Sequence, residues 1–338
     1  MTPLHPYQTL IIPLAAALIC AGLIVMLHPL LRRYALARPN ARSSHVMPTP
    51  QGGGIAVMIA IAIAAPLAGA LGAASFGHEI AVVMAAAFCL AAVGMIDDLR
   101  PIAVIPRLAL QLAIVAVLVV ALPSQLRILP AVPIGLERAL AVLGLLWFIN
   151  LVNFMDGLDW MTVVEMLPLS AALAALAYFG EAPAIILPVA LALAGALLGF
   201  APFNRPIARL FLGDVGSLPI GLLTGWCLLE LASHQHLAAA LLLPLYYLAD
   251  ATITLFRRIA RGERFWDAHR SHFYQRATDN GFSVRQVVAS VFVLNLYLAG
   301  LAVASVVIRS TTADAATLVL GALGVMVVLV RFSKARTG

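Results

Sequence analysis

Five of the 15 acidic residues of this chain stand beside long apolar runs, where carboxylates are costly to keep. They are Asp97, Asp98, Asp156, Asp159 and Asp214. Carboxylates gathered at one face of a helical bundle repel one another, so a cation or a strong hydrogen-bond donor must lie among them. We therefore expect these five side chains to surround a shared ligand.

The kind of ligand atom favours magnesium. Hard carboxylate oxygens without Cys or His nearby suit Mg²⁺, which prefers to share its coordination with phosphate. Asp156 and Asp159 are three residues apart and would share one face if that stretch is helical. Asp214, between Gly213 and Gly216, is either a helix N-cap or a metal ligand. Capping alone gives no reason for the two glycines, so we expect Asp214 to be a metal ligand.

Two segments carry groups that suit an anion. Residues 47–54, "MPTPQGGG", could turn backbone N–H groups toward a phosphate, although a glycine triplet is more often a flexible turn. In "FNRPIARLFLGD", Arg205 and Arg209 lie one turn apart, ahead of the third acidic stretch. Both segments are expected to help bind a diphosphate.

A third segment, residues 256–283, is rich in arginine and contains His269 and His272. Two histidines three residues apart can face one ligand on a helix, or they can form a polar cluster at headgroup level. Their spacing alone leaves both interpretations open.

Membrane helices must position these groups, because 63% of the 338 residues are hydrophobic, 11% are charged and the mean hydropathy is +1.01. A soluble domain carries about 25% charged residues. Runs long enough to span a bilayer lie near 8–31, 52–71, 79–96, 104–122, 136–151, 161–178, 183–201, 215–231, 237–257, 284–308 and 312–331. We expect one all-α polytopic membrane domain, residues 1–338, with about eleven transmembrane helices. The three cysteines lie inside the runs and are expected to be packing residues.

Orientation follows from the basic residues, which the positive-inside rule places in the cytoplasm. The odd-numbered loops and the C-terminal tail hold 18 of the 21 Lys and Arg residues, and the even-numbered loops hold three. We expect the N-terminus outside, the C-terminus in the cytoplasm and all five aspartates at the cytoplasmic face. This topology explains the basic residues, so we expect no nucleic-acid partner.

Together these features indicate a pocket for a magnesium-bound diphosphate at the membrane surface. A cation-coupled transporter or lipid flippase is the alternative, but transporters place their acids near the bilayer midplane on broken helices. Only Glu165 and Glu230 are expected to lie deeper. A non-catalytic scaffold is a further alternative, and the sequence leaves a homodimer open.

Five motifs in this order resemble the polyprenyl-phosphate N-acetylhexosamine-1-phosphate transferases, known as glycosyltransferase family 4. The motifs are "PTPQGGG" (48–54), "DD" (97–98), "NLVNFMDGLDW" (150–160), "FLGDVGSLPIG" (211–221) and "HRSHFYQR" (269–276). The resemblance implies Mg²⁺-dependent transfer, with Mn²⁺ as a substitute, of a sugar-1-phosphate from a UDP-N-acetylaminosugar to undecaprenyl phosphate, releasing UMP. It also implies a multi-pass protein of the bacterial inner membrane.

The resemblance further implies a role for each matched residue. Asp97 and Asp98 match the paired aspartates, one of which is proposed to deprotonate the lipid phosphate, and Asp98 is also a candidate metal ligand. Asp214 matches the magnesium-binding aspartate, and His272 a histidine that contacts phosphate or sugar. The candidate substrate-binding residues are Asn153, Asp156, Asp159, Arg205, Arg209, His269 and Arg276.

The chain departs from the family pattern at a few positions. Trp160 stands where the family often has glycine, and Tyr274 and Gln275 stand where many relatives have histidines. The "HRSHFYQR" form looks most like the branch that starts O-antigen synthesis with modified N-acetylated 6-deoxy sugars. We therefore expect a role in O-antigen or other cell-surface polysaccharide synthesis.

Overall fold

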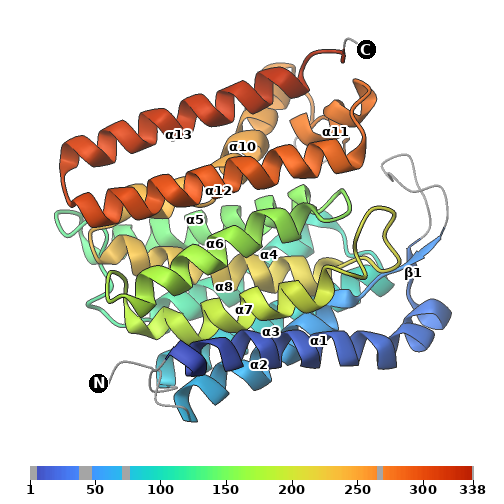
Figure 1. Ribbon diagram of the computed structural model, residues 1–338, viewed down its shortest axis with the longest axis horizontal. Helices are drawn as coiled ribbons and strands as arrows, with labels where there is room; N and C mark the ends of the chain where they lie inside the picture. Colours follow the sequence, from blue (N-terminus) through green and yellow to red (C-terminus); the bar gives the residue numbers. More distant parts are fainter. Residues whose placement is uncertain (1–5, 38–47, 71–76, 265–268, 337–338) are drawn as a thin grey trace.

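The computed structural model of the protein describes residues 6–37, 48–70, 77–264 and 269–336. Within these ranges the chain is a bundle of long helices with one short two-stranded ribbon (Figure 1). Arg38 and Arg42, which the count of loop charges includes, lie outside the described residues.

The helices in chain order are α1 (Pro6–Tyr34), α2 (Gly53–Ala70), α3 (His78–Leu99), α4 (Val104–Ala121), α5 (Ile134–Met155), α6 (Met161–Tyr178), α7 (Leu187–Phe200), α8 (Asp214–Ser233), α9 (Leu237–Leu242), α10 (Leu245–Ala260), α11 (Phe273–Asp279), α12 (Val284–Ile308) and α13 (Thr311–Phe332). A 3₁₀ turn, η1 (Ala184–Ile186), precedes α7, and β1 (Leu36–Ala37) pairs with β2 (Thr49–Pro50) in antiparallel register. Eight helices of the described part are long and apolar enough to cross a membrane, and two apolar helices are shorter. The prediction of an all-α polytopic membrane protein is confirmed.

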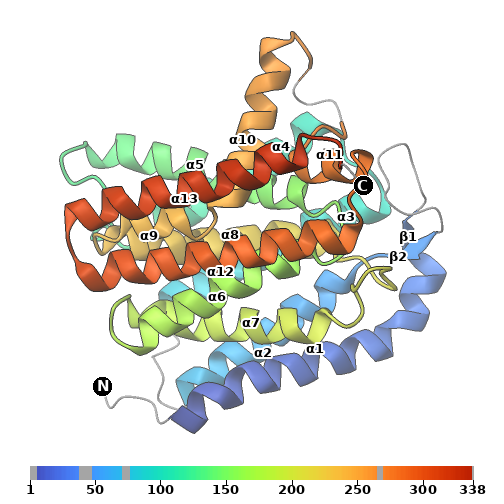
Figure 2. The same ribbon diagram turned by 45° about the horizontal axis from the view of Figure 1, so that its top comes forward.

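The ninth apolar run, 237–257, is not one helix as expected. It divides at Leu243 and Pro244 into α9 and α10, because proline lacks the N–H that a helix interior needs. Helix α10 then leaves the bundle at a steep angle and projects from its side (Figure 2). The other ten runs each correspond to one apolar helix.

Helix α8 lies at the centre of the bundle and is buried on nearly all its surface. It packs on α2, α3 and α5, and glycines let the backbones approach closely. A Cβ at Gly54 of α2 would lie 2.2 Å from the Cα of Gly216, and one at Gly94 of α3 would lie 2.3 Å from the carbonyl carbon of Asp214. The start of α8 is therefore fixed against two neighbours before any side chain contributes.

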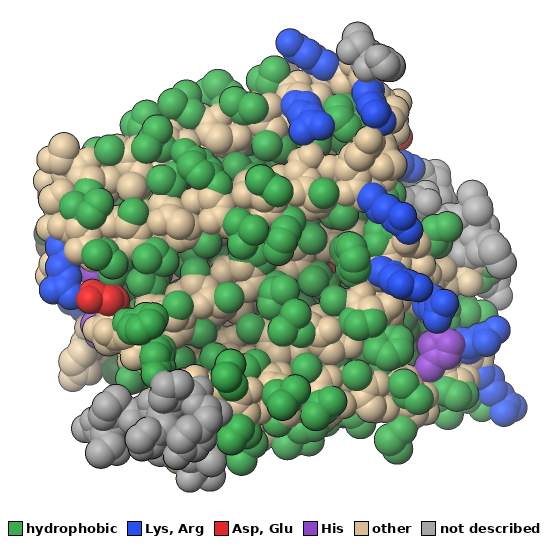
Figure 3. All heavy atoms as spheres, viewed as in Figure 1, with side chains coloured by type: hydrophobic (Ala, Val, Ile, Leu, Met, Phe, Trp, Pro, Cys, Tyr) green, Lys and Arg blue, Asp and Glu red, His purple; other side chains and the backbone are tan. Residues whose placement is uncertain are grey.

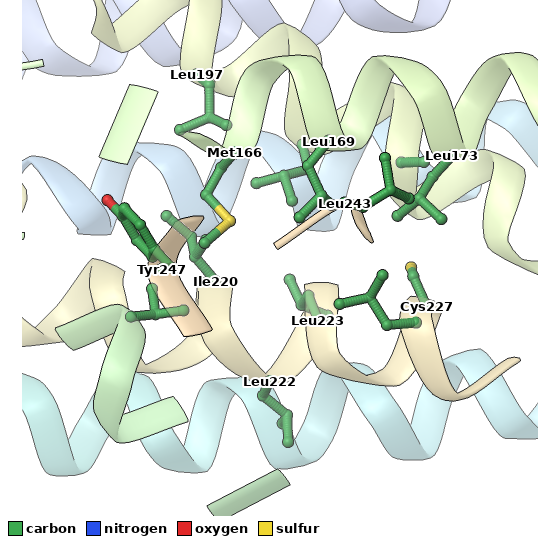
Figure 4. Packing of buried hydrophobic residues seen from close by; sticks show 14 of the residues in the cluster. Met166, Leu169, Leu173, Leu197, Ile220, Leu222, Leu223, Cys227, Leu243 and Tyr247 are labelled. Atoms are coloured by element: carbon green, nitrogen blue, oxygen red, sulfur yellow. The ribbon is translucent and has the colours of Figure 1, made fainter. Parts of the chain in front are cut away.

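Apolar side chains fill the space between α6, α8 and the α9–α10 break (Figure 4). Met166 and Leu169 of α6 lie close to Ile220 and Leu223 of α8, and Tyr247 closes this layer beside the break. The outer helix faces are also apolar, with large exposed side chains along their length (Figure 3). Such an exterior fits lipid and not water.

The loops that carry most of the arginines lie together at one end of the bundle. Arg285 donates to the carbonyl of Pro206 (3.2 Å), and Arg336 donates to Gln286 (2.9 Å). At the other end, Arg309 pairs with Glu181 (2.6 Å). The uneven distribution of basic residues in the sequence is thus also uneven in space.

Candidate active site

A carboxylate from one helix caps the start of another. Asp98, near the end of α3, accepts backbone N–H bonds from Asp214 (3.0 Å) and Val215 (3.1 Å), the first residues of α8. Gly213 has φ +78°, and a Cβ there would lie 2.5 Å from Oδ2 of Asp98, so only glycine leaves room for the cap. The cap places a negative charge at the positive end of the α8 dipole.

Because Asp98 supplies the cap, the side chain of Asp214 is used elsewhere. Asn153 of α5 donates to Oδ1 of Asp214 (2.7 Å) and to the hydroxyl of Ser217 (2.9 Å). Arg107 of α4 donates to Oδ2 of Asp97 (2.6 Å) and lies 3.5 Å from Oδ2 of Asp214. The glycines around Asp214 therefore belong to helix capping and packing, and the carboxylate itself belongs to a network.

Four helices thus contribute to one polar cluster at the arginine-rich end of the bundle. We call it the carboxylate cluster, and its members are Asp97, Asp98, Arg107, Asn153, Asp214 and Ser217. Sequence reasoning missed Arg107 and Ser217 as site residues. It counted Arg107 only as a loop charge, although its place in the first turn of α4 puts it within reach of the aspartates. Ser217 gave no signal beyond lying three residues after Asp214.

The cluster has the donor atoms for a magnesium ion shared with a substrate. Among the described residues, no group of three His, Cys, Asp or Glu side chains is disposed to hold a metal. Mg²⁺, however, is usually held by one or two carboxylates together with phosphate and water oxygens. Asp214 has 23% of its side chain exposed and can offer an oxygen to such an ion. The residues therefore fit a cation that arrives with a phosphate and do not form a closed metal cage.

Asp156 and Asp159 do not share a helix face, so that expectation was wrong. Helix α5 ends at Met155 and α6 begins at Met161, and the aspartates lie in the loop between them. Asp156 accepts a hydrogen bond from Thr162, while Asp159 is buried and accepts the N–H of Ala208 (2.9 Å). Asp159 therefore helps to hold the loop before α8.

Asp156 is close enough to the carboxylate cluster to be affected by it. The pKa of Asp156 is raised to about 7. Burial is the largest cause, the negative charges of Asp98 and Asp159 act in the same direction, and the hydrogen bond from Thr162 opposes the shift. A carboxyl that titrates near neutrality ionises readily when a cation binds beside it. Asp156 is therefore poised to respond to a positively charged ligand.

The loop of residues 201–213 is not helical, so Arg205 and Arg209 are not one helical turn apart as expected. Both side chains are exposed. Asn204 anchors the loop, since its side chain accepts the N–H of Trp160 (2.7 Å) and donates to the carbonyl of Leu210 (2.9 Å). The two arginines lie on a fixed loop beside the start of α8.

Trp160 stands where relatives often have glycine, and its backbone shows why. Its φ of 65° lies in the left-handed region that glycine adopts without strain. The indole N–H donates to the carbonyl of Ala201 (2.7 Å), which ties this residue to the end of α7. That contact helps to offset the backbone conformation.

The glycine triplet does not present its N–H groups to an anion, so that expectation was also wrong. Gly53 and Gly54 donate to the carbonyls of Phe211 and Leu212 (both 2.9 Å). Gln51 donates to the carbonyl of Asp98 (2.7 Å). The triplet therefore joins the start of α2 to the loop before α8.

Asp250 is a buried acid that the sequence reasoning missed. It lies on α10, is 0% exposed, and accepts the N–H groups of Phe273 (2.9 Å) and Tyr274 (3.1 Å) at the start of α11. The same carboxylate lies 3.2 Å from Nδ1 of His272. A single acid in a strongly apolar run gave no pattern, and only the break at Pro244 marks its helix as unusual.

Helix α11 is locked onto the loop that carries Asp156. The hydroxyl of Tyr274 donates to the carbonyl of Phe154 (2.9 Å), and a Cβ at Gly157 would lie 2.2 Å from that hydroxyl. Gly157 is thus needed for packing against Tyr274. Since Tyr274 replaces a histidine of many relatives, this departure has a structural role.

The remaining candidates lie around the segment before α11. The rings of His269 and His272 are 4.9 Å apart, and His272 is 4% exposed. Arg276 is half-buried and lines a cavity of about 320 Å³. The other lining residues are Thr254, Arg257, Arg258, Arg261, Arg270 and Ser271. His269 and His272 therefore lie close together in the segment before α11 and not on a helix, and Arg276 lies in an arginine-lined cavity beside them.

The fold and site define a polytopic helical membrane protein with an oxygen-rich, arginine-containing site at one end of its bundle. Residues 80–232, which include every residue of the carboxylate cluster, match the model of glycosyl transferase family 4. The decaprenyl-phosphate N-acetylglucosaminephosphotransferase of Mycolicibacterium smegmatis is 30% identical over 295 residues, 76% of this chain and 72% of that protein. A probable undecaprenyl-phosphate N-acetylglucosaminyl 1-phosphate transferase of Bacillus subtilis is 25% identical over 309 residues, 86% of this chain and 83% of that protein.

A phospho-N-acetylmuramoyl-pentapeptide-transferase of Streptococcus pneumoniae is 33% identical over a shorter stretch of 117 residues, 35% of either chain. The chain belongs to glycosyl transferase family 4, the polyprenyl-phosphate N-acetylhexosamine-1-phosphate transferases. The resemblance noted from the five motifs is confirmed.

Proposed function

We propose that the protein transfers a sugar-1-phosphate from a UDP-N-acetylaminosugar to undecaprenyl phosphate and releases UMP. The observation that carries this proposal is the carboxylate cluster, in which Asp97, Asp98, Asn153 and Asp214 meet from three helices with Arg107 among them. Family membership supports the reaction class, because the relatives are named as phosphosugar transferases to decaprenyl or undecaprenyl phosphate.

In this reaction an oxygen of the lipid phosphate attacks the sugar-proximal phosphorus of the UDP-sugar. A new P–O bond forms, the bond to the bridging oxygen breaks, and UMP leaves with that electron pair. A phosphate monoester is largely ionised near neutral pH, so it is already a nucleophile and needs little help from a base. We therefore favour direct displacement, and trapping of a phosphosugar-enzyme without lipid acceptor would contradict it.

The main obstacle is electrostatic, since two charged phosphates must approach each other. At 4 Å one such pair repels by about 4 kcal/mol even at an effective dielectric of about 20. Arg107 already lies between Asp97 and Asp214 and can turn toward a phosphate that displaces one of these contacts. Asp97 would then position the guanidinium as well as face the lipid phosphate.

We further propose that Asp214, Asn153 and Asp98 would hold a Mg²⁺ ion, with Mn²⁺ as a substitute. Such an ion neutralises charge on the diphosphate and on the departing UMP. The network already fixes the Asp214 carboxylate through Asn153. Activity should therefore depend on divalent cation and be lost in EDTA.

For the substrate side, we propose that Asp156, Asp159 and Arg205, Arg209 line the nucleotide-sugar side of the site. His269, His272 and Arg276 would contact its phosphates or sugar. Asp159 would act through the loop that it anchors, and the exposed Arg205 and Arg209 would touch substrate directly.

We propose that the site faces the cytoplasm of a bacterial inner membrane, on the positive-inside rule. The product would feed O-antigen or another cell-surface polysaccharide. A homodimer is compatible with the proposal and is not required by it.

The reaction is tested by reconstituting the protein with undecaprenyl phosphate, Mg²⁺ and a panel of radiolabelled UDP-N-acetylaminosugars. The proposal predicts label in the lipid fraction and equimolar UMP for at least one donor, and neither product for Asp214→Asn. A transporter or flippase would move substrate across liposomes without UMP release, and a scaffold would tolerate neutralisation of all five aspartates. Either result would overturn the proposal.

A further inference from the structure

A groove on the apolar exterior lies between α12 and α13. It encloses about 460 Å³ and is lined by Ala289, Ser290, Val293, Leu294, Tyr297, Val328 and Arg331. Its length along α12, from Ala289 to Tyr297, is about 12 Å at 1.5 Å per residue. Five of its seven lining residues are apolar, which suits an acyl chain.

One end of the groove is bounded by a close contact between the two helices. A Cβ at Gly324 of α13 would come within 2.9 Å of the ring of Tyr297. The hydroxyl of Tyr297 donates to the carbonyl of Leu320 (3.3 Å). Tyr297 therefore joins α12 to α13 at the end of the groove away from Ser290, while Val293 between them is 66% exposed and open to a ligand.

The other end of the groove is polar and cationic. Arg331 lies at this mouth, exposed, with Nη1 3.4 Å from the hydroxyl of Ser290. The hydroxyl of Ser290 donates to the carbonyl of Gln286 (2.8 Å) and accepts from Arg331, so the guanidinium is the group that can donate to a phosphate oxygen. Most Lys and Arg side chains on this face of the molecule lie at one end (Figure 3), and Arg331, in the last turn of α13, adds a cationic group to the apolar lining of the groove.

The mouth is also tied to α11, the segment that carries the residues next to His272. The guanidinium of Arg331 lies over the ring of Phe282, 5.4 Å from its centroid, and Phe282 packs on Phe332. Asn280, directly after α11, donates to the carbonyl of Phe332 (2.7 Å) and accepts the N–H of Arg336 (2.9 Å). A ligand that holds Arg331 in place would therefore also stabilise the packing of the end of α13 on α11.

We propose that this groove is a binding site for an anionic phospholipid, with one acyl chain between α12 and α13 and the phosphate on Arg331. The chain would be held by burial against the groove walls, and the phosphate by the cationic mouth. The site is separate from the carboxylate cluster, because α13 packs on α9, α10, α11 and α12 and contributes no residue to that cluster. Binding would favour the arrangement of α11 described above.

The test uses the full-length protein in phosphatidylcholine vesicles and needs no enzymatic activity. A tryptophan is placed in the groove by Val293→Trp and, as a matched control, outside it by Val327→Trp. Val327 is 67% exposed on α13, next to the groove residue Val328. Quenching of each new tryptophan, after subtraction of the parent protein's emission, is titrated with brominated phosphatidylglycerol and with brominated phosphatidylcholine.

We expect the groove tryptophan to be quenched at several-fold lower mole fraction by the anionic lipid, and the control to be quenched equally by both lipids. Adding Arg331→Gln to Val293→Trp should reduce the preference by about fivefold, which corresponds to about 1 kcal/mol for one surface arginine. Equal quenching by both lipids, or a preference that survives Arg331→Gln, would overturn the proposal. Absence of quenching by both lipids would also overturn it, because it would show that a protein surface covers the groove. Relief of quenching by trace undecaprenyl phosphate would overturn it as well, because the groove would then be a polyprenyl site.

Discussion

Replacement of Asp250 by asparagine tests whether one buried carboxylate organises the histidine-bearing segment. The carboxylate accepts two backbone N–H bonds from the start of α11 and lies beside the imidazole of His272. The hydroxyls of Tyr246 (3.2 Å) and Thr254 (3.4 Å) donate to it as well. Asp250→Asn keeps the size of the side chain and replaces one acceptor oxygen by a donor NH₂ group.

The cost follows from which partners can adjust. Hydroxyls can turn and accept from the new NH₂ group, but backbone N–H groups cannot. With the remaining oxygen on one N–H of α11, the other N–H faces a donor and stays buried without a partner, at about 1–3 kcal/mol. Loss of the charge from the remaining bonds adds a further 1–2 kcal/mol or so, so we expect about 2–5 kcal/mol of destabilisation.

The assay is the apparent Tm of purified protein in detergent, together with kcat for phosphosugar transfer. We expect Asp250→Asn to lower Tm by about 5–10 °C and kcat by at least tenfold, because α11 and His272 lose their common anchor. The control is Glu181→Gln, which removes an acid that pairs with the exposed Arg309 at the other end of the bundle (2.6 Å). An exposed pair of this kind contributes about 0–1 kcal/mol. If Asp250→Asn behaves like Glu181→Gln in both measurements, the anchoring role is wrong.

Three further substitutions test the site and its supports. Burial raises the pKa of Asp156 to about 7, so the folded state keeps a proton that the unfolded state releases near 3.8, and stability falls as pH rises from about 4 to about 7. Ionising such a group costs about 4 kcal/mol if it is fully buried. Because Asp156 is half-buried, we expect Asp156→Asn to stabilise the protein by about 1–2 kcal/mol at pH 8. The Tm of the variant should exceed that of the wild type at pH 8, and the two Tm values should converge near pH 4. Gly54→Ala should lower Tm sharply because its Cβ would meet the Gly216 backbone at 2.2 Å, whereas Gly300→Ala, with no atom within 4 Å, should not; equal behaviour would contradict the packing argument. Arg107→Gln should lower kcat at least tenfold with little change in Tm, and a normal kcat would remove Arg107 from the reaction.

The transmembrane helices were predictable because apolar runs of the right length have few alternatives in a membrane protein. Ten of the eleven runs are single helices, and the basic residues of their loops do gather at one end. The prediction of one helix for the ninth run was wrong because a single proline changes the average hydropathy very little. Pro244 ends a short helix and lets α10 leave the bundle, which in turn brings Asp250 to α11.

The site was predictable in its members and less so in its geometry. Asp97, Asp98, Asn153 and Asp214 do meet, since each stands where its helix reaches the same end of the bundle. The sequence could not show that Asp98 caps α8. A cap of this kind joins residues 116 positions apart in the chain, and only packing of α3 on α8 brings them together.

The glycines illustrate the same limit. The sequence predicted that backbone N–H groups of residues 47–54 could face a phosphate. In the structure Gly53 and Gly54 donate instead to carbonyls of the loop before α8. The acceptors of these N–H groups could not be known without the fold.

The central claim is that the carboxylate cluster passes a phosphosugar, and not a bare sugar, to a polyprenyl phosphate. The most direct measurement follows UDP-N-acetylglucosamine labelled with ³²P at the sugar-proximal phosphorus through one reaction with undecaprenyl phosphate and Mg²⁺. The account predicts that the label moves into the lipid with release of unlabelled UMP in the wild type, and that Asp214→Asn leaves it in the nucleotide sugar. Recovery of the label as UDP, or undiminished lipid labelling by Asp214→Asn, would contradict it.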